Sequence, residues 1–215
     1  NLSGTNLEDY SILGKVENLI SLDLKANQIS DISFLAKLKK LQWINLADNQ
    51  ITDISPISGL TELASIWLFK NKIADFDVFN KLICPELVTH LSLGNNFLID
   101  ISFIKRFSNI KTLHLQANQI KSIDVLENLT ELKKLKLEAN LISDITPIKG
   151  LKSLTEVNFG LNPIIELPSW ITQLNMDVKW KRYVHDKGIG FFDNPLIRPP
   201  VEIVKQGNIA IDDYL

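Results

Sequence analysis

The segment LISLDLKANQISDISFLAKL, residues 19–38, recurs along most of the chain. Its apolar residues and its asparagine return 22 residues later in LQWINLADNQITDISPISGL, residues 41–60. Further copies begin at Leu63, Val88, Ile110, Leu132 and Leu154; all steps are 22 residues except that from Leu63 to Val88, which is three longer. Self-similarity of this period predicts a solenoid, in which each repeat buries its apolar side against its neighbours.

Each repeat predicts a short strand followed by a turn. In the first copy, Leu22 and Leu24 alternate with polar residues, so they point into the core of a parallel sheet. An asparagine then follows at the same phase in every copy, and its amide can both donate to and accept from backbone groups left unpaired inside the coil. We expect these side chains to form a structural ladder: Asn27, Asn49, Asn71, Asn96, Asn118, Asn140 and Asn162.

The outer side of each coil is predicted to be 3₁₀ or irregular, because only about nine residues separate one turn from the next strand. An aspartate that can cap this outer turn follows most of the asparagines, at Asp31, Asp53, Asp75, Asp100 and Asp144. Longer helices are expected only where the third repeat expands. At the start of the chain, Thr5 occupies the asparagine position of an incomplete copy, so we expect the sequence to open inside a repeat.

The 22-residue period with its Asn-x-Ile-x-Asp-Ile signature resembles the leucine-rich-repeat family, and its internalin-like members in particular. The resemblance implies an α/β solenoid: a horseshoe with a concave parallel β-sheet, a mostly 3₁₀ or irregular convex side, and a C-terminal helical cap. Residues 1–174 are predicted to form the repeats, the first of them truncated. Residues 175–215 are predicted to form the cap and to lead toward a following domain.

The cap segment begins with an alternating stretch at residues 176–180, which predicts a strand, and a turn is expected at residues 186–188. Residues 189–191 either pair back as a hairpin or supply one last repeat strand, and the turn ahead of them favours the hairpin. Two prolines ahead of Val201 predict the start of a helix. A second helix is expected over residues 209–215, with Gly207 between the two.

The same segment also resembles the junction in Roco proteins where leucine-rich repeats run into a Ras-like GTPase domain and its dimerisation domain. The matching positions are Asn194-Pro195-Leu196, Pro199-Pro200, Glu202-Ile203, Gly207, Ala210-Ile211 and Tyr214-Leu215. Related segments end other intracellular repeat proteins as well. No Gly-x-x-x-x-Gly-Lys-Ser/Thr run is present, so we expect these residues neither to bind nor to hydrolyse GTP.

Composition excludes several classes of partner. The formal net charge is −2 and the basic residues form no stripe, which argues against nucleic acid. No apolar run approaches the ~18 residues that cross a bilayer, so no membrane contact is expected. Cys84 is the only cysteine, which favours a reducing compartment, and we expect a cytoplasmic bacterial protein. The sequence does not define an oligomeric state.

The concave face is the predicted partner-binding site, because its side chains point away from the leucine core. Among them, Trp43, Trp67 and Phe69 are large aromatics of the kind enriched at protein interfaces. Alternatively, these rings pack on one another and on the strand backbone. The predicted contact residues are Trp43, Asn45, Trp67, Phe69, His90, Ser92, His114 and Gln116; residues such as Lys134, Lys136, Glu138 and Glu156 are interpreted as a solvated charged rim.

No catalytic, metal or cofactor site is predicted. Of the three histidines, His90 and His114 are expected on the concave face without a third ligand, and His185 lies in the cap segment. The leading hypothesis is a non-catalytic interaction module of a Roco-type protein that binds a partner protein or restrains the adjacent GTPase and dimerisation domains. The alternative is a secreted or surface adhesion domain of the internalin type. A repeat-bearing enzyme would need catalytic residues that the sequence does not offer.

Overall fold

The computed structural model describes residues 1–181 and 187–215, which form two compact units. The first unit comprises residues 1–98 and 102–110, and the second comprises residues 99–101 and 111–215. Within both units each repeat places one short strand in a parallel sheet, and the predicted solenoid fold is confirmed. Among the described residues, no helix is long and apolar enough to cross a membrane.

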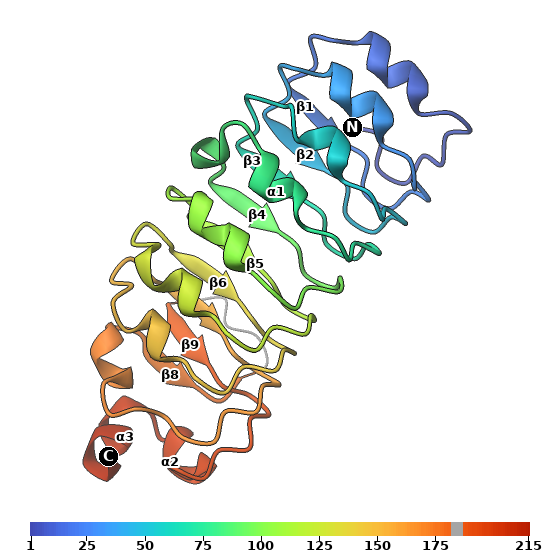
Figure 1. Ribbon diagram of the computed structural model, residues 1–215. Coiled ribbons are helices and arrows are strands. Elements are labelled where there is room, and N and C mark those ends of the chain that lie inside the picture. The colour runs from blue at the N-terminus through green and yellow to red at the C-terminus, as the bar shows by residue number, and fades with distance from the viewer. Residues whose placement is uncertain (182–186) are drawn as a thin grey trace. The chain divides into compact units, whose positions relative to one another are not determined.

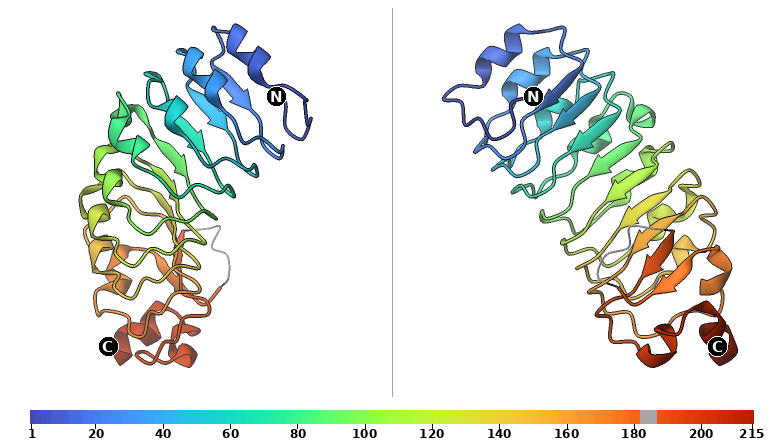
Figure 2. Two further views of the ribbon diagram at one scale, coloured as in Figure 1. Left: turned by 45° about the vertical axis from the view of Figure 1, so that its right-hand side comes forward. Right: turned by 180° about the vertical axis from the view of Figure 1, so that it is seen from behind.

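In the first unit, each repeat contributes a three-residue strand, and the strands pair in parallel in chain order (Figure 1). These strands are β1 (Ser21–Asp23), β2 (Trp43–Asn45), β3 (Ser65–Trp67) and β4 (His90–Ser92). Seen from behind, the strands lie in front of the outer turns (Figure 2, right). The outer turns are η1 (Ser11–Lys15), η2 (Ser33–Lys37), η3 (Ser55–Ile57), α1 (Val78–Lys81), η4 (Pro85–Leu87) and η5 (Ser102–Arg106).

The outer side is therefore almost entirely 3₁₀, as predicted, and the short helix α1 occurs where the third repeat expands. Stacked phenylalanines fill the space that the expansion opens. The ring centroids of Phe79 and Phe103 lie 5.0 Å apart, and Phe107 meets Phe79 edge-on at 5.8 Å. The Arg106 guanidinium donates to the backbone carbonyls of Phe79 and Leu82 at 2.8 and 3.0 Å, which closes the end of α1.

The second unit follows the same plan but changes strand order at its end. Its strands are β5 (Thr112–His114), β6 (Lys134–Lys136), β7 (Glu156–Asn158), β8 (Asp177–Lys179) and β9 (Gly188–Gly190), and their spatial order is β5-β6-β7-β9-β8. All these pairs are parallel. The outer turns and helices are η6 (Asp124–Asn128), η7 (Thr146–Ile148), η8 (Ile171–Leu174), α2 (Val201–Val204) and α3 (Asn208–Tyr214).

The favoured hairpin at residues 189–191 is wrong. Strand β9 runs parallel to β8 and also pairs with β7, with Asn158 facing Gly190. It is therefore the last repeat strand, which was the other alternative. Core packing explains why β9 lies beside β7. The Phe191 ring, directly after β9, stacks on the Phe159 ring with centroids 5.8 Å apart and continues the apolar core. The turn expected at residues 186–188 begins at Asp186, which lies outside the described residues.

The asparagine side chains satisfy the backbone inside each coil. Asn49 Nδ2 donates to the carbonyls of Leu24 and Leu46, both at 3.0 Å, and its Oδ1 accepts the Ile29 N–H at 3.0 Å. Sequence reasoning missed a further member of this ladder, Asn194, which is 5% exposed and donates to Phe159 O and Phe191 O. At the other end, the Thr5 hydroxyl donates to Leu2 O, three residues back, as the amides do.

Outer-turn aspartates accept the backbone N–H two residues further on. Asp31, Asp53 and Asp144 do so at 2.7–2.8 Å, from Ser33, Ser55 and Thr146. Asp9 makes the same contact with Ser11, and the Ser11 backbone N–H and hydroxyl hold the pKa of its carboxyl below the ordinary value. These carboxylates are committed to local structure.

The first residue of helix α3 lies against the edge strand β8. Helix α2 follows Pro200, as predicted, and Gly207, at φ +93°, separates it from α3. Asn208 donates to Met176 O at 3.0 Å and accepts the Val178 N–H at 2.8 Å. Because this amide pairs backbone groups along β8, it protects an otherwise open sheet edge.

Candidate partner-binding face

The sheet face that points away from the apolar core is here called the outward face. In the first unit, its side chains stand in rows across neighbouring strands, and each row is fixed by the parallel register. One row contains Ser21, Trp43, Ser65 and His90, and the next contains Asp23, Asn45, Trp67 and Ser92. A third row, just beyond the strands, contains Lys25, Ala47, Phe69 and Gly94, as the continuing backbone hydrogen bonds show.

The three predicted aromatic side chains of this face, Trp43, Trp67 and Phe69, are half-buried. The Trp67 indole N–H donates to the Ser65 hydroxyl at 2.9 Å, which orients the ring along the face. In the part of the chain that the structure describes, neither Trp43 nor Phe69 belongs to a contacting pair of aromatic rings. Among the described residues, Trp43 and Phe69 therefore form no aromatic pair, which leaves packing on the strand backbone from the alternative considered above.

Polar members of these rows differ in how far they reach solvent. Asn45 is half-buried, and its Oδ1 accepts the Ala47 N–H at 3.1 Å. His90 is half-buried as well, and its Nδ1 lies 2.8 Å from the Thr89 hydroxyl. Ser92 is only 3% exposed, so it contributes little surface to a partner. Beside Phe69, the Lys70 ammonium pairs with Asp48 at 2.8 Å.

The second unit carries the remaining predicted contact residues. His114 on β5 and Gln116 just beyond it are half-buried on the outward face. His90 and His114 belong to different units, and His185 lies outside the described residues. Over the described part of the chain, no group of three or more His, Cys, Asp or Glu side chains could hold a metal ion.

The supposed charged rim of the second unit is partly buried. Glu156 is 6% exposed and pairs with the Lys134 ammonium at 3.1 Å. Burial raises the pKa of the Glu138 carboxyl, despite its own backbone N–H and the positive charge of Lys136. The expectation of a fully solvated rim is therefore wrong for both glutamates, because neighbouring coils screen outward-facing side chains that alternation alone would assign to solvent.

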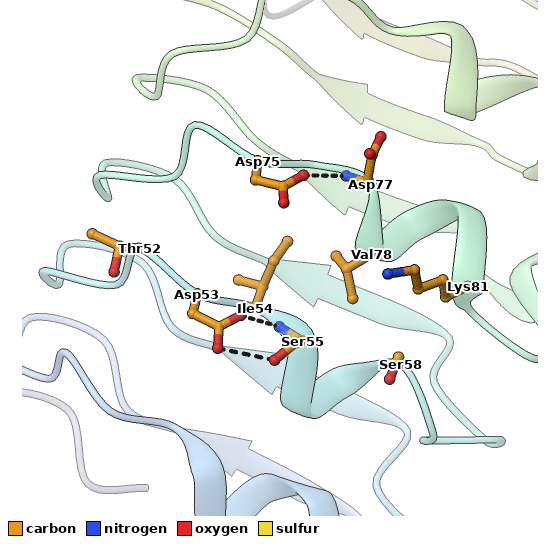
Figure 3. Close-up of a pocket in the computed structure, with 9 residues that line it drawn as sticks. All are labelled: Thr52, Asp53, Ile54, Ser55, Ser58, Asp75, Asp77, Val78 and Lys81. Carbon is orange, nitrogen blue, oxygen red and sulfur yellow. Dashed lines mark hydrogen bonds between the residues drawn. The ribbon is translucent and has the colours of Figure 1, made fainter.

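A pocket of about 290 Å³ opens on the outer flank of the first unit (Figure 3). Asp53, Asp75, Asp77 and Lys81 line it, over an apolar floor that includes Val78. Figure 3 shows the first two aspartates hydrogen-bonded to their own turns. A groove of similar size lies two coils earlier, so the pocket follows from the stacking of coils. It brings together no arrangement of catalytic groups.

Comparison with known proteins assigns the class. The family model "Leucine Rich repeats (2 copies)" matches residues 39–81, 87–128 and 108–150. The chain is therefore a leucine-rich-repeat domain. Such domains are typically non-enzymatic modules that bind other proteins. A search of curated proteins found no match.

Solved structures place this chain near the internalins. It is similar to an internalin (inlF) from Listeria monocytogenes, with 27% identity and a TM-score of 0.77, over 92% of this chain and 54% of that one. An internalin C2 (inlC2) from the same organism shares 29% identity at a TM-score of 0.68, over 75% of this chain and 70% of that one. The chain thus spans about half the length of the inlF structure.

A more distant likeness shows the fold alone. The ectodomain of the plant receptor kinase GASSHO1/SCHENGEN3 from Arabidopsis thaliana shares 22% identity at a TM-score of 0.68, over 88% of this chain and 23% of that one. That structure is a complex with CASPARIAN STRIP INTEGRITY FACTOR 2.

Proposed function

We propose that this domain binds a partner protein through the outward face of its first unit, with Trp43, Trp67 and Phe69 as anchors. The observation that carries the proposal is three large aromatic side chains on the side of the sheet opposite the leucine core. Ala47 and Gly94 flank Phe69 in the same row and are buried, so the half-buried Phe69 ring is the part of this stretch that a partner can contact. Tryptophan is enriched among the few interface positions that dominate binding energy.

The test begins with a photo-crosslinking amino acid at position 69 and, as a control, at position 87. Leu87 lies on the outer turn and is 46% exposed. A protein that crosslinks from position 69 alone is then purified and its affinity measured with the double variant Trp43→Ala/Trp67→Ala. We expect affinity to fall by about three orders of magnitude, since each of the two anchors contributes on the order of 2 kcal/mol. Unchanged affinity, or loss of the fold in the double variant, contradicts the proposal.

We further propose a cytoplasmic, non-catalytic role in a Roco-type protein, where the domain binds a separate partner or restrains adjacent GTPase and dimerisation domains. Its support is the sequence of the C-terminal segment, from Asn194 through Pro199-Pro200 to Leu215. Any such restraint acts through contacts that differ between two states of the protein. A gene that encodes a strand and a phosphate-binding loop directly after Leu215 would support this role.

An internalin-like adhesion domain is the second candidate. The likeness to inlF favours it, because it covers 92% of this chain. The two candidates differ in compartment, so a secretory signal peptide in the full reading frame would favour adhesion and contradict the cytoplasmic proposal. Export of the protein, measured by fractionation of the source cells, separates them directly.

A further inference from the structure

A row of residues on the outward face of the second unit combines hydrogen-bond acceptors with aromatic rings. Gln116, Glu138, Gly160 and Phe192 occupy equivalent positions on neighbouring coils. The backbone hydrogen bonds from Ala117 to Glu138, from Ala139 to Gly160 and from Leu161 to Phe192 align them, at 2.8, 2.9 and 2.8 Å. We call these four residues the acceptor row.

Two acceptors in this row have no donor. Gln116 Oε1 and Glu138 Oε2 are both shielded from solvent, and within the described residues neither accepts a hydrogen bond. Buried polar atoms are almost always paired, and leaving one unpaired is costly. The two atoms belong to adjacent coils, whose backbones lie about 4.8 Å apart, and we take them to indicate a group that donates to both.

The neighbours of the pair favour a positively charged donor. Gly160 contributes no side chain to the row, so none lies between Glu138 and Phe192. Phe192 itself lies 6.0 Å from the Trp180 ring, at an angle of 52°. Aromatic faces attract cations, and a guanidinium also stacks on them.

We propose that Gln116 and Glu138 bind an arginine guanidinium of the partner protein. A guanidinium presents parallel N–H donors in a planar fork, which suits two acceptors on neighbouring coils. This inference rests on the proposed function, because it specifies one chemical group of the partner. The second unit would then also contact the partner, through a charged hydrogen bond to Glu138, whereas the first unit contacts it through aromatic side chains.

The surrounding charges set how binding depends on pH. The positive charge of Lys136 favours ionisation of Glu138, and the negative charge of Glu156 opposes it. Lys134 forms an ion pair with Glu156. His114 lies beside Lys136 on the neighbouring strand. No ion pair joins Lys136 to Glu138 within the described residues. A bound guanidinium stabilises the Glu138 carboxylate, whose pKa burial has raised. Affinity should therefore rise with pH until Glu138 is fully ionised in the free protein.

The test uses butylguanidinium chloride as the probe and NMR of the whole chain as the readout. We expect saturable shifts of the Gln116 side-chain amide and of the Glu138 carboxyl carbon. Tetramethylammonium chloride carries the same charge without N–H donors, and it should bind at least about tenfold more weakly. The variant Glu138→Gln should weaken guanidinium binding by a similar factor and remove its pH dependence. Glu131→Gln, at an exposed position before β6, is the matched control and should leave binding unchanged.

Three outcomes overturn the inference: no saturable shift at Gln116 and Glu138, equal binding of tetramethylammonium, or unchanged binding in Glu138→Gln. The probe reports on the acceptor row whatever protein binds the sheet. If Trp43→Ala/Trp67→Ala still binds the probe and its affinity for the partner is unchanged, only the proposed aromatic anchors are rejected. A partner that depends on the tryptophans while the probe does not bind would reject only the guanidinium site.

Discussion

Removal of one ladder amide tests how the coils are held together. Asn140 is 5% exposed, and its Nδ2 donates to Leu115 O and Leu137 O, both at 3.0 Å. Its Oδ1 accepts the Ile120 N–H at 3.1 Å. The substitution Asn140→Ala therefore leaves one N–H and two carbonyls inside the second unit without their side-chain partner.

The expected loss follows from these three groups. A buried polar group without a partner costs about 1–3 kcal/mol, and water that enters the vacated space recovers part of it. We expect Asn140→Ala to lower the free energy of unfolding by about 3 kcal/mol. Asn140→Thr should cost roughly half as much, because a threonine hydroxyl can still donate to the carbonyl three residues back. The natural Thr5 makes this contact with Leu2 O.

Urea unfolding followed by circular dichroism measures the free energy, and amide hydrogen exchange of Ile120 reports the local effect. Asn128→Ala is the control, since Asn128 is exposed on an outer turn. If Asn140→Ala matches this control within about 0.5 kcal/mol, the scatter of ordinary surface substitutions, the ladder does not stabilise the coil. Unchanged exchange of the Ile120 amide would refute the argument equally.

Two further predictions concern single positions. The Thr146 hydroxyl and backbone N–H lower the pKa of Asp144 from 3.8. The ionised carboxylate therefore stabilises the fold at neutral pH, and this contribution is lost as pH falls through the lowered pKa. In Asp144→Asn, the free energy of unfolding measured with urea should depend less on pH between about pH 5 and pH 2; the same pH dependence as in the unmodified protein would contradict this. A Cβ at Gly160 would lie 3.0 Å from Phe192 O, whereas one at Gly150 would meet nothing within 4 Å. Gly160→Ala should therefore destabilise the fold by about 1–3 kcal/mol and Gly150→Ala should not; similar melting temperatures would contradict this difference.

The repeat frame could be predicted because it is local and periodic. Each ladder asparagine follows an inward leucine or phenylalanine at fixed spacing, so phase alone identified residues that satisfy the backbone. Asn194 was not predicted because 32 residues separate it from Asn162, instead of the 22 of the regular repeat. A usable signal was present: Phe159-x-x-Asn162-Pro163 recurs as Phe191-x-x-Asn194-Pro195. Matching the motif without a fixed period would have identified it.

Strand order at the end of the second unit could not be predicted in this way. β8 and β9 are both short alternating stretches, and either could extend the sheet beyond β7. The choice depends on long-range packing, since Phe191 after β9 meets Phe159, whereas β8 is paired at its edge by Asn208. The turn expected at Gly188 favours a hairpin, but a parallel β9 brings Phe191 into the apolar core, which is more favourable than the antiparallel pairing.

Outward-facing residues show most clearly where periodicity stops being informative. Alternation assigns Trp43 and Glu138 to the same face, yet it says nothing about what lies beside them in neighbouring coils. Register supplies that information: it places Trp43 between serines, and Glu138 between an amide and a glycine. The core positions must stay apolar in every coil, whereas the outward positions are free to vary. The residues that recognise a partner in such a domain therefore lie in rows across the strands, and their chemistry is set by the neighbouring coils.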